Sequence, residues 1–317
     1  MRRFPVVVAA LLAGTSVLRA QPLLGPPPGA ILTRELAARV NGEPIKLIDV
    51  QAVLDQRPVP VRLSPDQERA HRRAALDMLI DDALMRQYLN RSVQTPPNHE
   101  IDRVVMEFAE ALRKQNKTLD QYLRQEKQTD AQLRADVVTE LQWKAFLAAR
   151  YSENEARAYF EANRPYFEKV QVQASHILMR VSPTASPSER EKARMNMTNL
   201  RNLILNRQIS FEEAARKYSD CPSKERGGDL GRFAYKFVVV DSFARAAFAT
   251  PVGDISEVVA TEFGLHLIKV TGRTPADPAD FDSMKDLVRR TMAQEQGLYA
   301  GILQEQKRSA KVEVLMQ

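Results

Sequence analysis

The chain has 317 residues, of which 44% are apolar and 27% are charged, and its formal net charge is +6 at pH 7. This length and composition can supply one or two ordinary hydrophobic cores. Acidic and basic residues are mixed along the chain, which gives no sign of a nucleic-acid-binding surface. The single cysteine, Cys221, excludes an internal disulfide, so disulfides do not take the place of a core.

Residues 1–20 have the pattern of a secretory signal peptide. The stretch MRRFPVVVAALLAGTSVLRAQ begins with Arg2 and Arg3, continues with an apolar run too short for a membrane span, and offers a cleavage position at Ala20. No cysteine follows the run, so a lipid-anchored form is not expected. We expect a periplasmic or otherwise exported protein. An uncleaved segment that anchors the chain in the membrane is the alternative.

The first half of the remaining chain reads as a short hairpin followed by helices. Residues 21–30, QPLLGPPPGA, are rich in proline and glycine and predict a flexible lead. In ARVNGEPIKL two short strands flank the turn pair Asn41-Gly42. From Leu47 to about Asn163 the pattern is helical, and capping boxes mark four helix starts. These boxes are Ser64-Pro65-Asp66-Gln67, Thr118-Leu119-Asp120-Gln121, Thr129-Asp130-Ala131-Gln132 and Ser152-Glu153-Asn154-Glu155.

The pattern changes near Phe167 and predicts a second unit of α+β type. Further capping boxes begin at Ser186 and Ser210. The predicted elements are a strand over 170–180, helices over 186–206 and from 211, a strand near 230–234, a helix near 242–249, and strands near 255–259 and 265–271. A unit of about 105 residues is within the usual size of a domain.

The C-terminal segment, 275–317, starts with two prolines that end the second unit. One long amphipathic helix is predicted over 281–309, followed by a short strand in KVEVLM. Two short strands alone make a marginal sheet in water. We therefore expect this segment to pack on the helical domain, 31–168, with the second unit, 169–274, inserted between them. An independent C-terminal tail is the alternative.

Three residues of the second unit are candidates for chemistry: His176, Cys221 and His266. The simplest interpretation places both histidines in a core and treats the thiol as a small apolar group. A cysteine–histidine hydrolase lacks local support, because no oxyanion donors or helix N-terminus accompany the thiol. The wide spacing of the three residues is poor for a metal site. The residues alone leave the packing interpretation open.

Three segments resemble the parvulin peptidyl-prolyl isomerases. The first comprises FEEAA at 211–215, Ser219, Ser223 and GGDLG at 227–231, and it resembles the family signature. ASHIL, 174–178, resembles the first strand of the family, and TEFGLHLIKV, 261–270, resembles the last. The resemblance covers about a third of the chain, residues 169–274, with every segment in family order.

The resemblance implies a role for each matching residue. His176 and His266 match a histidine pair that faces across the sheet, Thr261 matches a residue that hydrogen-bonds the pair, and Cys221 matches a position filled by cysteine or aspartate. The implied apolar pocket for the proline ring is formed by Leu230, Phe233 and Phe243. The segment before Phe243 is one residue longer than in parvulins and lacks their methionine, and either Val238 or Val239 is expected in its place. No metal or other cofactor is implied.

The whole arrangement resembles the SurA- and PrsA-type foldases. It implies an α+β protein with a mostly helical, SurA-like N-terminal chaperone domain completed by the C-terminal helix, and a parvulin-like domain with an antiparallel sheet. The implied partners are unfolded or partly folded exported polypeptides with X-Pro bonds, and nucleic acid is not among them. The implied function is an exported peptidyl-prolyl isomerase and chaperone. The alternative is a non-catalytic holdase whose parvulin domain only binds peptides.

Overall fold

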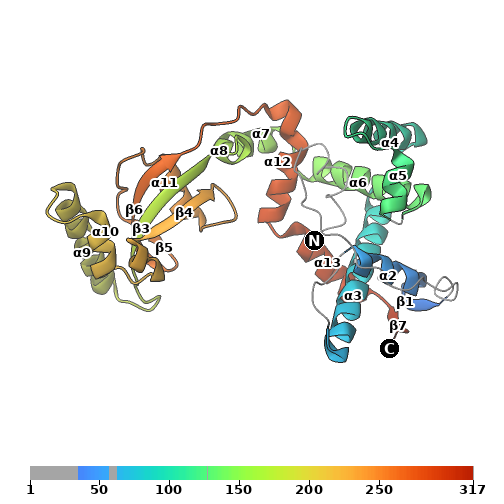
Figure 1. Ribbon diagram of the computed structural model, residues 1–317, viewed down its shortest axis with the longest axis horizontal. Coiled ribbons are helices and arrows are strands. Elements are labelled where there is room, and N and C mark those ends of the chain that lie inside the picture. Colours follow the sequence, from blue (N-terminus) through green and yellow to red (C-terminus); the bar gives the residue numbers. More distant parts are fainter. Residues whose placement is uncertain (1–34, 57–62, 127, 317) are drawn as a thin grey trace. The chain divides into compact units, whose positions relative to one another are not determined.

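A computed structural model describes residues 35–56, 63–126 and 128–316 (Figure 1). The predicted signal peptide and flexible lead, 1–30, lie outside these residues. Contacts divide the chain into unit 1, which holds the residues up to Glu153 and from Arg289, and unit 2, Asn154–Val288. In the described ranges, no helix is long and apolar enough to cross a membrane.

Unit 1 contains a three-stranded sheet that joins both ends of the chain. β1 (Leu36–Val40) and β2 (Glu43–Lys46) form the predicted hairpin, and Asn41 and Gly42 both have the positive φ that a tight hairpin turn requires. On its other side β1 pairs antiparallel with β7 (Val312–Val314), with Ala38 opposite Val314 (Figure 1). The predicted terminal strand is therefore a sheet strand.

Three helices of unit 1 begin where their capping boxes predict. The boxes at Ser64 and Thr118 are formed, and so is the box at Thr129. In each, the side-chain oxygen accepts from the backbone three residues later, which satisfies a donor that the first helical turn leaves unpaired. The helices are α2 (Leu47–Asp55), α3 (Pro65–Ser92), α4 (Asn98–Arg113), α5 (Leu119–Gln125) and α6 (Asp130–Arg150).

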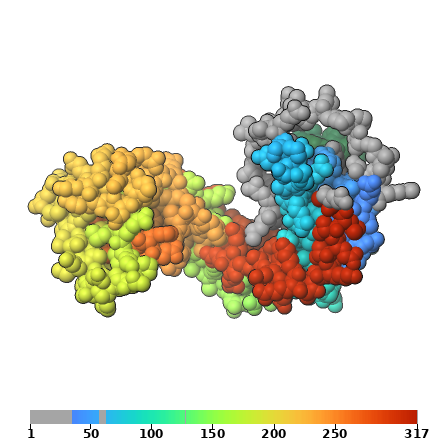
Figure 2. Space-filling view, turned by 90° about the horizontal axis from the view of Figure 1, so that it is seen from below, coloured from blue at the N-terminus to red at the C-terminus, as the bar shows by residue number. Residues whose placement is uncertain are grey.

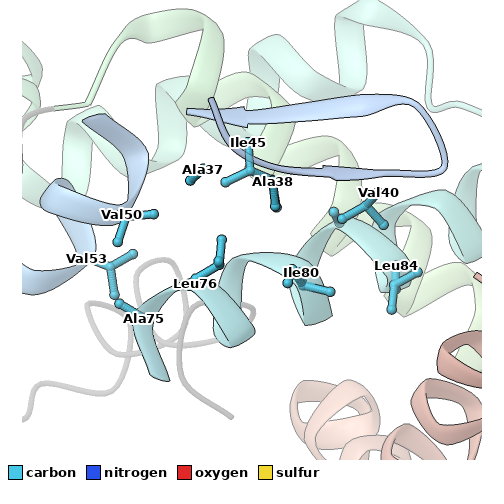
Figure 3. Close-up of a cluster of buried hydrophobic side chains, with 11 residues drawn as sticks. Ala37, Ala38, Val40, Ile45, Val50, Val53, Ala75, Leu76, Ile80 and Leu84 are labelled. Carbon is cyan, nitrogen blue, oxygen red and sulfur yellow. The ribbon is translucent and has the colours of Figure 1, made fainter. Parts of the chain in front are cut away.

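The hairpin, α2 and α3 share one core (Figure 3). Ala38 and Val40 of β1 point towards Leu76 and Ile80 of α3, which explains why so short a sheet is stable. Leu303 near the C-terminus packs against the same core. The space-filling view shows the C-terminal residues beside α3 and the N-terminal hairpin (Figure 2).

The C-terminal helix is interrupted, so the prediction of one helix over 281–309 is wrong. α12 (Phe281–Glu295) and α13 (Leu298–Ser309) are separated at Gly297, which has φ +60°. Glycine adopts this left-handed conformation without the steric cost that other residues incur. The apolar pattern continues on both sides of the break, so periodicity did not reveal it. The boundary between the two units, after Val288, lies within α12.

Unit 2 is built on a four-stranded antiparallel sheet with the order β4-β3-β6-β5, as expected for the α+β class. Its strands are β3 (Gln171–Met179), β4 (Asp229–Ala234), β5 (Val259–Thr261) and β6 (Gly264–Arg273). Its helices are α7 (Glu153–Ala162), α8 (Arg164–Phe167), α9 (Pro187–Leu205), α10 (Phe211–Tyr218), the 3₁₀ helix η1 (Pro222–Arg226) and α11 (Asp241–Ala249).

The two faces of this sheet carry separate cores. Val172 and Ala174 of β3 pack with α11, whereas Ile177 packs with α9 and α10. On β6, Ile268 lies on the α11 face and Leu267 on the opposite one. The alternation follows from the two-residue period of a strand.

The strand predicted near 255–259 is displaced, and that prediction is wrong. Ile255 makes only an isolated bridge to Lys269, and regular pairing begins at β5. Ser256 interrupts the ladder, because its backbone N–H donates to the carbonyl of Ile268 at 2.8 Å while its Oγ accepts from the Ile268 N–H at 3.0 Å. A side chain therefore replaces one backbone group of the ladder.

Candidate active site

Two buried histidines face each other on the α11 side of the unit 2 sheet. His176 lies on β3 and His266 on the adjacent β6, and both share strand parity with residues of the α11 core. Their Nδ1 atoms are 3.3 Å apart, and the rings are nearly parallel with centroids 5.4 Å apart. One Nδ1–H can thus donate to the other Nδ1.

Thr261 extends this contact into a chain of hydrogen bonds. Its Oγ1 lies 2.8 Å from His266 Nε2 and accepts from the Phe263 backbone N–H at 3.1 Å. Two assignments of protons satisfy these distances. In one, the hydroxyl donates to Nε2 and His266 donates through Nδ1 to His176. In the other, His176 donates through Nδ1 to His266, which donates through Nε2 to the hydroxyl oxygen.

Burial keeps both histidines neutral at pH 7. It lowers the pKa of His176 from 6.5 to about 4, and the pKa of His266 falls to about 4 through burial and the nearby His176. The Phe243 ring meets both imidazoles edge-on, at 5.6 and 5.3 Å between centroids. The pair is therefore suited to holding geometry rather than supplying a positive charge.

The loop that carries Cys221 is fastened to the end of β3. Ser219 Oγ accepts from the backbone N–H groups of Leu178 and Cys221, at 3.1 and 3.2 Å. Asp220 donates its N–H to the Leu178 carbonyl, and its carboxylate accepts from the Arg180 N–H at 2.8 Å. These bonds bring the half-buried thiol to the strand of His176. The sequence did not single out Asp220, although its position next to Ser219 of the parvulin-like motif could have indicated a role in this loop.

A glycine brings the rest of this loop onto β3. The His176 N–H donates to the Gly228 carbonyl at 2.9 Å. A Cβ atom on Gly228 would lie 2.3 Å from the His176 carbonyl oxygen, and its φ is +85°. Only glycine fits this approach without displacing the strand. The GGD segment is thus a backbone-packing element of the histidine site.

The predicted apolar pocket residues divide into two groups. Phe233 and Phe243 are buried with ring centroids 6.0 Å apart, and Leu230 and Val239 pack against the same cluster. Val238 is 61% exposed and lies outside this cluster. Of the two valines predicted to replace the methionine, Val239 is therefore the one placed beside the aromatic rings.

Among the described residues, no group of three histidine, cysteine or acidic side chains could hold a metal ion. The site thus consists of a neutral histidine pair, a threonine, a nearby thiol and an apolar cluster. An antiparallel sheet with these features is the fold of a parvulin-type rotamase domain.

The comparisons with known proteins agree. The family model described as "Rotamase: PPIC-type PPIASE domain" matches residues 176–272. The peptidyl-prolyl cis-trans isomerase Pin1 of Malus domestica is 36% identical over 115 residues, which cover 32% of this chain and 94% of that protein. The chain belongs to the parvulin-type peptidyl-prolyl cis-trans isomerase family.

Foldases of the PrsA type match more of the chain. Foldase protein PrsA 1 of Bacillus cereus is 35% identical over 150 residues, 46% of this chain and 47% of that protein. Foldase protein PrsA of Clostridium botulinum strain Langeland is 26% identical over 311 residues, 87% of this chain and 86% of that protein. A helical region around an isomerase domain is thus a PrsA/SurA-like foldase architecture.

Proposed function

We propose that the protein is an exported foldase that isomerises X-Pro bonds in unfolded or partly folded polypeptides and also binds them as a chaperone. The hydrogen-bonded set of His176, His266 and Thr261 beside a buried aromatic cluster is the observation that carries the proposal. The signal-peptide pattern of residues 1–20 supports a periplasmic or otherwise exported location.

The chemistry requires a twisted amide and no covalent intermediate. Resonance gives the prolyl bond a barrier of about 18–20 kcal/mol, and uncatalysed exchange takes tens of seconds or longer. An apolar pocket of Leu230, Phe233, Val239 and Phe243 would hold the proline ring and exclude the water that stabilises the planar amide. No cofactor is needed, because no bond is formed or broken.

Cys221 has an electrostatic role in this proposal. A thiol or carboxylate near the substrate carbonyl disfavours negative charge on that oxygen, and so weakens the resonance that keeps the amide planar. An aspartate at this position would act in the same way. The neutral histidine pair and Thr261 would hold β3 and β6 together. The bonds of Ser219 to Leu178 and Cys221 would hold the loop on β3.

Chaperone binding is assigned to the helical region. Residues 31–168 and 275–317 are proposed to form one domain, with the isomerase, 169–274, inserted between them, although contacts group 154–168 and 275–288 with the isomerase in unit 2. The pairing of β1 with β7 and the packing of α13 on α3 support this. Unit 1 also has a groove of about 640 Å³, lined mainly by apolar side chains, which fits an apolar stretch of a client polypeptide. The apolar side chains that line this groove include Leu36, Leu47, Val50, Leu54, Leu315 and Met316.

The alternative is a holdase without turnover, and the valine in place of the pocket methionine favours it. Exchange NMR on a short unphosphorylated peptide with one X-Pro bond separates the two. The isomerase proposal requires exchange above the buffer rate that is strongly reduced in Cys221→Ala. A protein that prevents aggregation of an unfolded client yet leaves the exchange rate unchanged would be a holdase.

A further inference from the structure

The loop between β4 and α11 carries a strained and exposed aromatic residue. Phe237 has φ +66°, in the left-handed region that bulky side chains avoid. Its side chain is 50% exposed, and the adjacent Val238 is 61% exposed. Burial therefore does not offset the backbone strain at Phe237. Strain of this kind persists where the surrounding structure imposes it, and it concentrates at functional sites.

Aromatic rings surround the start of the loop that carries Phe237. Lys236 is buried, and its Nζ lies over the rings of Tyr159 and Tyr235, 5.2 and 5.7 Å from their centroids. The Tyr166 ring meets Phe237 edge-on, with centroids 5.8 Å apart. The backbone conformation of Phe237 thus leaves half of its side chain exposed to solvent.

The exposed pair is continuous with the proposed proline pocket. Val239 and Val240 follow directly in the chain and pack against the cluster that contains Phe243. Phe243 in turn contacts both histidines of the site. Four consecutive apolar residues, 237–240, therefore lead from the pocket to the surface.

The register of the sheet gives the distance along β3 from His176 to the end of β4, where this loop starts. β4 begins opposite Ser175 and ends with Ala234 opposite Gln171. His176 and Gln171 are five residues apart on β3, which is roughly 16 Å along a strand. An extended substrate whose proline sits at the histidine end of the pocket, where Phe243 lies, would reach the loop with a side chain several residues away from the proline.

We propose that Phe237 and Val238 form an apolar ledge that binds an aromatic or aliphatic side chain of the substrate, several residues from the isomerised proline. The proposal rests on the proposed isomerase function. The ledge would select X-Pro bonds that lie near apolar segments. Unfolded polypeptides expose such segments, whereas folded proteins mostly bury them.

Three unphosphorylated peptides with the same X-Pro bond test the ledge in the full chain. The short peptide ends next to the X-Pro pair. The apolar peptide of about twelve residues carries leucine and phenylalanine several positions from the proline, far enough to span the distance along the strand. In the third peptide, serine replaces those apolar residues. The variants are Phe237→Gly and Val238→Ser, and Val252→Ser is the control, because Val252 is 54% exposed elsewhere in unit 2.

Phe237→Gly is expected to lower kcat/KM for the apolar peptide about five- to tenfold, since the substrate loses an aromatic contact. The short and serine peptides should be isomerised at the wild-type rate. The melting temperature should change little, because glycine relieves the strain of the positive φ while the contact with Tyr166 is lost and the unfolded chain gains entropy. Val238→Ser should have a smaller effect in the same direction, and Val252→Ser should have none.

Equal losses on all three peptides would give Phe237 a structural role and overturn the ledge. An unchanged kcat/KM on the apolar peptide would also overturn it. If the wild-type protein isomerises none of the peptides, the proposed isomerase function fails instead. The ledge is then decided by the affinity for the apolar peptide, which Phe237→Gly must lower and Val252→Ser must not.

Discussion

Of the glycine-to-alanine substitutions in the glycine-rich loop, Gly228→Ala should disrupt the site most. The new Cβ would lie 2.3 Å from the His176 carbonyl oxygen, at a φ of +85°. The clash joins the new Cβ, which is fixed to the backbone, and a backbone oxygen, so a side-chain rotation cannot relieve it. Gly231→Ala is the matched control, since Gly231 also has a positive φ, +71°, but its Cβ would have no neighbour within 4 Å.

The two substitutions share one cost and differ in another. A non-glycine residue in the left-handed region costs about 1–2 kcal/mol, which applies to both. At Gly228 the strand and loop must also separate, and the 2.9 Å bond from the His176 N–H to Gly228 is lost. A buried donor without a partner costs about 1–3 kcal/mol more. We expect Gly228→Ala to destabilise unit 2 by about 2–5 kcal/mol and Gly231→Ala by about 1–2 kcal/mol.

Calorimetry and hydrogen exchange are suitable assays. The single tryptophan, Trp143, lies in unit 1, so its fluorescence does not report on unit 2. The transition of unit 2 should fall by roughly 10–15 °C in Gly228→Ala. Exchange should accelerate in peptides that cover β3 and β4, and isomerase activity should fall. If both variants have the same stability and activity, the close approach of Gly228 to His176 does not hold the site together.

Three further results are expected. Cys221→Asp should retain much of the isomerase activity while Cys221→Ala loses most of it without melting the unit; equal inactivity of both variants would refute the electrostatic role. The pKa of each site histidine is lowered by burial from 6.5 to about 4, so the unfolded state binds protons first as the pH falls. The stability that the neutral pair contributes is present above pH 6.5 and is lost as the pH falls towards 4. The loss is up to about 3 kcal/mol for each of His176 and His266. Melting temperatures that do not change between pH 7 and 4.5 would contradict this prediction. Deletion of 278–317 should lower the melting temperature of the N-terminal region while 169–274 still folds and isomerises, and an unchanged transition would mean that the two ends share no core.

Local signals predicted most of the elements. Each capping box spans four residues, and those at Ser64 and Ser186 are formed as predicted because their partners are neighbours in the chain. The hairpin turn at Asn41-Gly42 is local for the same reason. The break at Gly297 was missed because helical periodicity does not show whether a glycine takes a left-handed conformation. The displaced strand was missed because Ser256 uses its hydroxyl on Ile268, a residue of another strand.

The family could be identified from the sequence by resemblance, because a motif can be matched by its residue types without knowledge of their contacts. The same motif supplied the residues that are proposed for the site. Two features depended on tertiary structure. The order of Phe237 to Val240 did not show which side chain meets the aromatic cluster, because an extra residue shifts the loop, and only packing places Val239 inward and Val238 in solvent. The neutral state of His176 and His266 likewise depends on burial between β3, β6 and α11, because a pKa responds to the surroundings of a side chain and a sequence does not contain those surroundings.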